Sequence, residues 1–177
     1  KRQTFIFAER EDGTKSSITY EEFNKQISKV GNALKISGFQ KGDVIALYMP
    51  QFIETYIAYF AILKIGCIVL PLFSGYGSNA VVERLNIANA KGIFTVEKTF
   101  RKGKEIKMFD LIKNDLDQVN SLKKVFLLGD EKGKKIFNWE NFKNVSDKLK
   151  TEEMEAEDPA IIPVSYTHLT LPTTVSV

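Results

Sequence analysis

The sequence predicts an α/β fold in which alternating strands and helices form a largely parallel sheet. Short runs rich in Val, Ile and Leu alternate along the chain with longer stretches whose apolar residues recur at helical spacing. The runs are continuously apolar, which is typical of strands buried on both faces. The 177 residues suffice for one domain with its own core. We therefore expect neighbouring strands to be joined by right-handed crossovers.

The first helix is predicted between Thr19 and Gly38. Thr19, followed three residues later by Glu22, has the pattern of a capping box, and Gly38 is placed to end the helix. Four apolar residues at helical spacing then share one face: Phe23, Ile27, Val30 and Leu34.

The second helix is predicted to open at Pro50, directly after an apolar strand at residues 43–49. Its apolar residues that recur on one face are Phe52, Tyr56, Phe60 and Leu63. An exposed turn is expected at 129–135 and an acidic linker at 148–158. The remaining expected elements are strands at 67–72, 92–97, 123–129 and 159–164, helices at 78–90 and 109–119, and a weaker helix around Trp139.

The composition argues against several classes of function. The 25 basic and 22 acidic residues are spread along the chain and leave a net charge of +3, so there is no electrostatic footprint for nucleic acid. The most apolar stretch, residues 56–73, is broken by a lysine, a glycine and a proline before it reaches the roughly twenty residues of a membrane helix. The lone Cys67 lies in an apolar run, which favours a core position and a reducing compartment, the cytoplasm.

Two loops that follow predicted strands are suited to a phosphate-bearing ligand. In the first, Gly75, Gly77 and Ala80 match the G-x-G-x-x-A fingerprint, with Glu97 about twenty residues further on. Taken alone, this pattern indicates an NAD-dependent oxidoreductase in which Glu97 holds a ribose hydroxyl. Pro71 and the two residues before the first glycine disagree with the tight turn that the fingerprint needs, which favours an ordinary strand-to-helix turn.

The second loop, residues 99–107, is basic. Arg101, Lys102 and Lys104 surround Gly103, so a turn there would present a guanidinium and ammonium groups together. Such a group of donors suits a phosphate monoester. The alternative is a solvated loop between two elements, which is what most basic loops are.

Most of residues 17–97 closely resemble the start of the AMP-forming acyl-CoA synthetases, in the adenylate-forming superfamily. The matching motifs are GFQKGDVIALYMP at 38–50, KIGCIVLPLF at 64–73 and ERLNIANAKGIFT at 83–95. The resemblance implies that the chain forms the first subdomain of the large N-terminal domain of these enzymes.

Within this superfamily, FSGYG followed by FRKGKEI looks most like the acetyl-CoA synthetase branch and its short-chain relatives. The resemblance assigns Phe73, Ser74 and Gly75 to the wall around the pantetheine or nucleotide of CoA, and Arg101 and Lys104 to its 3′-phosphate. Lys104 stands where arginine is common, which weakens bidentate recognition. The expected partners are a small carboxylate, ATP and CoA, with Mg²⁺ as a further cofactor.

The end of the sequence departs from the family. Residues 164–177 contain no charged residue, and the glycines and lysine of the family's phosphate loop are missing from them. We therefore expect residues 1–163 to be a partial AMP-binding domain without activity of its own, and 164–177 to be an anomalous tail of non-native origin. His168 lies in that tail and has little weight as a base or ligand. The alternative is that the tail is a genuine strand of a small CoA- or nucleotide-binding module.

Overall fold

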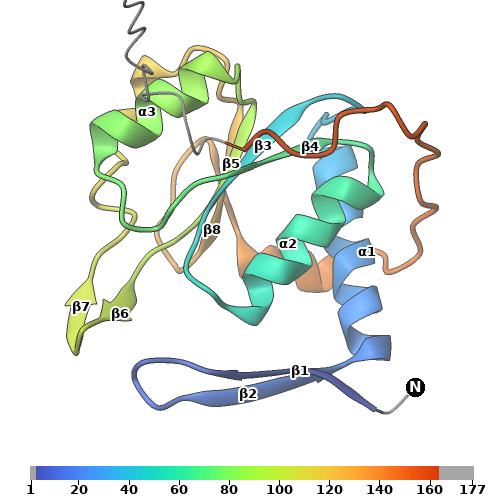
Figure 1. Ribbon diagram of the computed structural model, residues 1–177, viewed down its shortest axis with the longest axis horizontal. Coiled ribbons are helices and arrows are strands. Elements are labelled where there is room, and N and C mark those ends of the chain that lie inside the picture. Colours follow the sequence, from blue (N-terminus) through green and yellow to red (C-terminus); the bar gives the residue numbers. More distant parts are fainter. Residues whose placement is uncertain (1–2, 164–177) are drawn as a thin grey trace, which may run out of the picture.

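The computed structural model describes residues 3–163 and has a parallel sheet at its centre (Figure 1). Five strands are hydrogen-bonded in the order β4–β3–β5–β8–β9, and every neighbouring pair is parallel. The predicted α/β fold is therefore confirmed. The strands are β3 (Val44–Tyr48), β4 (Ile68–Pro71), β5 (Gly92–Val96), β8 (Lys124–Leu128) and β9 (Ile136–Asn138).

The α-helices lie on both faces of the sheet. In Figure 1, α1 (Tyr20–Ile36) and α2 (Ile53–Lys64) lie on one side, and α3 (Ser78–Ile87) lies on the other. The chain passes from β3 through α2 to β4, then returns through α3 to β5 on the opposite side of β3. Right-handed crossovers that run in opposite directions along a sheet place their helices on opposite faces, which explains this layering.

The predicted start and core face of α1 are confirmed. Thr19 Oγ1 accepts a hydrogen bond from the Glu22 amide at 3.2 Å, and Gly38 has a φ of 87° just after the helix. The Glu22 carboxylate accepts from the Gln26 side chain at 2.7 Å instead of returning to the Thr19 amide, so only half of the capping box is formed. The four predicted core residues of this helix are all buried.

The face predicted for α2 is wrong. Tyr56 and Phe60 are 40% and 43% exposed, whereas a neighbouring stripe faces the core. This helix is apolar almost all round, so the spacing of its aromatic residues does not distinguish the face that packs. The buried residues of α2 are Ile53, Ile57, Ala58, Ala61 and Ile62.

Residues 109–119, predicted as a helix, form turns and the short 3₁₀ helix η1 (Leu116–Gln118). Asn114 and Asp115 interrupt the helical pattern, because short polar side chains bond locally and compete with helix formation. The Asp115 carboxylate accepts hydrogen bonds from the hydroxyl of Ser78 and from the side chain of Gln118. The weaker helix predicted around Trp139 is also a 3₁₀ helix, η2 (Trp139–Asn144).

Two antiparallel hairpins and one further strand were not predicted. β9 lies between the exposed turn predicted at 129–135 and the weak helix predicted around Trp139. The hairpins lie below the sheet in Figure 1. They are formed by β1 (Thr4–Glu9) with β2 (Lys15–Thr19), and by β6 (Thr99–Arg101) with β7 (Lys104–Ile106).

The strand predicted at 159–164 is reduced to one parallel bridge between Ile161 and Val69 of β4. Pro159 and Pro163 flank this bridge and cannot donate to a strand ladder, which limits its length. The expectations for residues 164–177, including His168, lie outside the described residues. Within residues 3–163, no helix is long and apolar enough to cross a membrane.

Cys67 fills the core, as predicted. Its side chain is 1% exposed, and its thiol donates to the carbonyl oxygen of Gln40 at 3.1 Å. Burial raises the pKa of this thiol to about 12, because the thiolate would lose its hydration.

The raised pKa of Cys67 predicts a loss of stability at alkaline pH. An unfolded cysteine ionises near pH ~8.5, whereas the folded thiol keeps its proton until about 12. The contribution is therefore complete below pH ~8.5 and is lost as the pH rises towards the folded value. Urea unfolding between about pH 7.5 and about pH 10 should show a steeper decline for the wild type than for Cys67→Ala. Parallel declines would contradict the assignment.

Candidate functional site

Three segments that leave the same edge of the sheet converge on the candidate site. β3 lies between β4 and β5, and each strand is followed at its carboxyl end by a loop or hairpin. β3 leads through α2 towards β4, whereas β5 leads towards β8 in the opposite direction. Such a change of direction opens a crevice at the carboxyl ends of the strands, where α/β proteins bind ligands.

The β6–β7 hairpin places the two predicted phosphate contacts on one face. Lys102 and Gly103 form its turn with φ values of 52° and 72°, both in the left-handed region. Two-residue hairpins favour this type I′ geometry, and glycine adopts it readily. Arg101 and Lys104 are directly paired across the strands, so their side chains project from the same face of the hairpin.

Arg101 extends from this hairpin to the loop that follows β4. Its guanidinium carbon lies 5.2 Å from the centroid of the Phe73 ring. A Cβ atom added to Gly75 would lie 2.5 Å from Phe73 Cε1 and 2.6 Å from Arg101 Nη1. The close approach of these two side chains therefore requires a glycine at position 75.

Tyr76 holds this loop in position through contacts of its ring and of its backbone carbonyl group. Its ring meets Phe73 edge-on at a centroid distance of 5.7 Å, and the guanidinium carbon of the buried Arg84 lies 4.4 Å from its ring centroid. The hydroxyl of Tyr48, at the end of β3, donates to the Tyr76 carbonyl oxygen at 2.7 Å. Burial raises the pKa of Tyr48, and the positive charge of Arg101 offsets part of that rise. The neutral hydroxyl is thus retained as a donor.

A cleft of about 370 Å³ opens beside Arg101. Its walls come from the turn of the β1–β2 hairpin (residues 9–12), the segment after β3 (residues 50–52), Ser74 and residues 98–101. The lining combines aromatic and aliphatic groups with three basic side chains and three acidic ones, Glu9, Glu11 and Asp12, and the volume lies in the range of small-molecule sites. Of the residues assigned through the resemblance, Ser74 and Arg101 line this cleft, and Phe73 and Gly75 contact Arg101.

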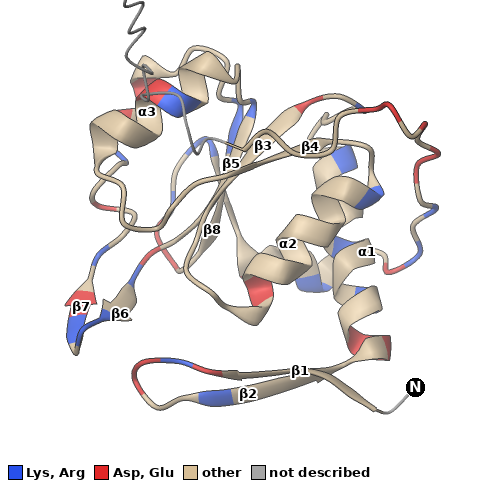
Figure 2. Cartoon of the chain, viewed as in Figure 1, with Lys and Arg blue, Asp and Glu red and all other residues tan. Residues whose placement is uncertain are grey.

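Lys104 is exposed and lies outside the lining of the cleft, although it is paired with Arg101. Within residues 3–163 its ammonium group has no acidic partner, whereas Lys98 forms an ion pair with Glu105 at 3.2 Å. Figure 2 shows acidic and basic residues side by side at the turns of both hairpins. Among residues 3–163, Arg101 and Lys104 therefore carry positive charges that form no ion pair, although three carboxylates line the same cleft as Arg101.

The turn of the β1–β2 hairpin is a wall of the cleft that sequence reasoning missed. The Glu11 carboxylate accepts a hydrogen bond from the Lys102 amide at 2.7 Å, across 91 residues of sequence. Arg10 lies over the Phe52 ring at 4.0 Å and forms an ion pair with Glu54 at 3.3 Å. No local pattern indicates such contacts, because they depend on how two distant hairpins meet.

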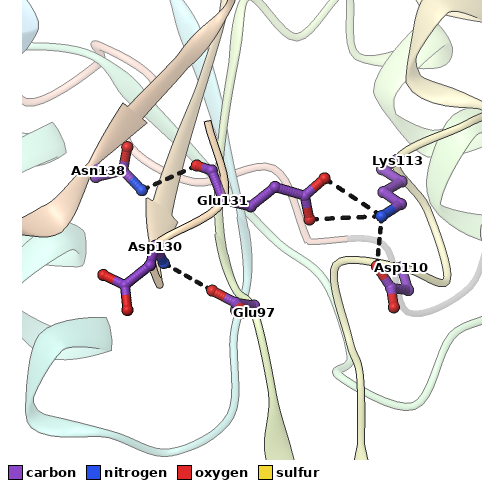
Figure 3. A network of polar contacts seen from close by, with 6 residues as sticks. All are labelled: Glu97, Asp110, Lys113, Asp130, Glu131 and Asn138. Carbon is purple, nitrogen blue, oxygen red and sulfur yellow. Dashed lines mark hydrogen bonds and ion pairs between the residues drawn. The ribbon is translucent and has the colours of Figure 1, made fainter. Parts of the chain in front are cut away.

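Glu97 does not take the role that the dinucleotide fingerprint gives it. Its Oε2 accepts from the Asp130 amide at 2.7 Å and holds the loop after β8 (Figure 3). A Cβ atom at Gly129 would collide with the Glu97 carboxyl group, so this contact is tight. In addition, β3 separates β4, which precedes the glycine loop, from β5, which precedes Glu97. A dinucleotide fold requires the glycine loop and the acidic residue to follow adjacent strands, and here they do not.

The rest of this network is also structural. Lys113 bridges Asp110 at 2.7 Å and Glu131 at 3.3 Å (Figure 3). Its hydrogen bond lowers the pKa of the Asp110 carboxyl group. Asn138 donates to the Glu131 carbonyl oxygen at 3.1 Å. In the described part of the chain, no group of three or more His, Cys, Asp or Glu side chains could hold a metal ion. Among the described residues, Arg101 and Lys104 can therefore supply cations for a phosphate.

Comparisons with known proteins show the family and the fold of this chain. The profile of the family described as "AMP-binding enzyme" matches residues 2–167. The acetyl-coenzyme A synthetase of Photobacterium profundum is 33% identical over 172 residues, which cover 90% of this chain and 26% of that protein. The enzyme of the same name from Chlorobaculum tepidum is 33% identical over 128 residues, or 72% of this chain and 19% of that protein.

A solved structure shows the same fold. The crystal structure of an acyl-CoA synthetase from Brucella canis superposes with a TM-score of 0.76 and 20% identity, covering 92% of this chain and 28% of that one. The chain spans about a quarter of the length of several such relatives. The profile match and the identity to acetyl-coenzyme A synthetases show that the chain belongs to the AMP-binding enzyme family of adenylate-forming acyl-CoA synthetases.

Proposed function

We propose that this chain supplies part of the CoA site of an AMP-forming acyl-CoA synthetase that acts on a short-chain carboxylate. In that reaction the carboxylate attacks ATP to give an acyl-adenylate and pyrophosphate, and the CoA thiol then displaces AMP. The observation that carries the proposal is the meeting of Arg101 with the Phe73–Gly75 loop at the edge of the cleft.

The geometry of Arg101 suits the 3′-phosphate of CoA. Its guanidinium carbon lies 5.2 Å from the centroid of the Phe73 ring, and a guanidinium so placed can still donate to a phosphate through its N–H groups. Within residues 3–163 these donors have no acidic partner, so a phosphate can accept from them. Lys104 projects from the same face of the hairpin and adds a second, less directional charge.

The short-chain preference rests on the relatives. Several that match are acetyl-coenzyme A synthetases, and the 3-hydroxypropionyl-coenzyme A synthetase of Sulfurisphaera tokodaii is 35% identical over 108 residues. The buried, lone Cys67 supports our further proposal of a cytoplasmic setting, because such thiols stay reduced there.

We also propose that the 177-residue chain does not form an acyl-adenylate on its own. The glycines and lysine of the family's phosphate loop are absent from residues 164–177, and the phosphates of ATP need such groups. Glycine lets a backbone wrap a phosphate, and a lysine neutralises its charge.

Removal of the Arg101 side chain should weaken CoA binding through the 3′-phosphate alone. We expect Arg101→Ala to lower the affinity for CoA at low salt by about tenfold or more, because a charge-assisted bidentate contact is lost. Wild type should bind 3′-dephospho-CoA much more weakly than CoA. Arg101→Ala should distinguish the two ligands far less than the wild type does, because only Lys104 remains to contact the 3′-phosphate. Isothermal titration calorimetry measures all four affinities, with Lys132→Ala as a control for charge alone. Equal binding of both ligands by the wild type would contradict the assignment.

Gly75 and Gly77 should respond differently to alanine. Gly75→Ala pushes the ends of Phe73 and Arg101 apart, so CoA affinity should fall several-fold while the free energy of unfolding changes by less than about 1 kcal/mol. Gly77 has an ordinary φ of −77° and open space around its Cβ position, so Gly77→Ala should bind CoA normally. A nicotinamide site would show the reverse order, because its second glycine contacts the pyrophosphate.

Adenylation by the chain alone should be undetectable. Exchange of pyrophosphate into ATP, measured with acetate and Mg²⁺, reports acyl-adenylate formation without any need for CoA. We expect none from the purified chain, with the full-length Photobacterium profundum relative as a positive control. Carboxylate-dependent exchange by the chain would overturn the proposal. CoA binding without exchange is the expected combination.

A further inference from the structure

The turn of the basic hairpin is held from outside by a single acidic residue. In a two-residue turn with positive φ at both centres, the amide of the first central residue has no partner within the hairpin. Lys102 occupies this position, and its amide donates to the Glu11 carboxylate at 2.7 Å. The hydrogen bond therefore fixes the backbone between Arg101 and Lys104.

Glu11 is itself presented by a well-anchored turn. The neighbouring Arg10 is partly buried, stacks on Phe52 at 4.0 Å and pairs with Glu54 at 3.3 Å. Asp12 Oδ1 accepts from the Thr14 amide at 2.9 Å and shapes the turn from the other side. Glu11 therefore lies between two residues whose side chains are both held by contacts with other parts of the chain.

We propose that Glu11 is a positioning residue, which holds the Lys102 turn so that Arg101 lines the cleft and Lys104 projects from the same face of the hairpin. This inference rests on the proposed CoA site. Glu11 does not touch the ligand in this account and acts only through the hairpin. Its own charge should repel an anionic ligand, so positioning and simple electrostatics predict effects of opposite sign.

Glu11→Ala distinguishes positioning by Glu11 from the electrostatic repulsion between its carboxylate and the ligand. Charge removal alone would strengthen CoA binding at low salt, whereas loss of positioning weakens it. We expect affinity to fall by about threefold or more, because one charge-assisted hydrogen bond is lost at an exposed site. Glu11→Gln keeps a carbonyl acceptor at the same position and should restore most of the affinity. Glu153→Ala removes an equal charge outside the lining of the cleft, where the carboxylate pairs with Lys150, and should leave CoA affinity equal or slightly higher.

Hydrogen exchange of the Lys102 amide provides a readout that does not need CoA. The exchange rate, measured by NMR on the ligand-free chain, should rise at least about threefold in Glu11→Ala and return towards wild type in Glu11→Gln. An unchanged rate in Glu11→Ala, or a gain in CoA affinity, would overturn the inference. If the wild type binds no CoA at all, the proposed function fails, and the exchange rate still decides whether Glu11 holds the turn.

Discussion

Parallel pairing of β3 with both β4 and β5 is the constraint on which the rest of the structure depends. Residues 45–48 of this strand are almost completely buried, so its register against both neighbours is determined by core packing. That register brings the ends of three strands to one edge. Tyr48, the last residue of β3, then uses its hydroxyl to hold the Tyr76 carbonyl oxygen. Packing in the sheet thereby determines the position of the loop that follows β4.

Charges in this protein fall into two groups with different roles. Around β8, Glu97, Lys113 and Glu131 are occupied by amides and opposite charges, so they stabilise loops and have little capacity left for a ligand. At the cleft, Arg101 is stacked on an aromatic ring, and Lys104 is exposed. The net charge of +3 therefore does not indicate which cations are available to a ligand. What matters chemically is which cations keep free donors at the edge of the sheet.

Local signals predicted much of the fold and part of the site. The apolar strands and the start of α1 were correct, because burial on both faces and capping are local properties. The face of α2 was wrong because a nearly uniform apolar helix has no distinct stripe. Resemblance to a family indicated Phe73, Gly75 and Arg101, which the structure brings together. Glu11, Tyr48 and Arg84 were missed, because each acts through a backbone or ring contact with a distant segment that no spacing reveals.

The most direct test of the CoA site is an NMR titration of the ¹⁵N-labelled chain with CoA. We expect saturable shifts in the Arg101 side-chain Nε–H and in the amides of residues 73–77 and 101–104. Those at 101–104 should be much smaller with 3′-dephospho-CoA. Shifts centred on the loop between β8 and β9, or shifts that do not depend on the 3′-phosphate, would contradict the account.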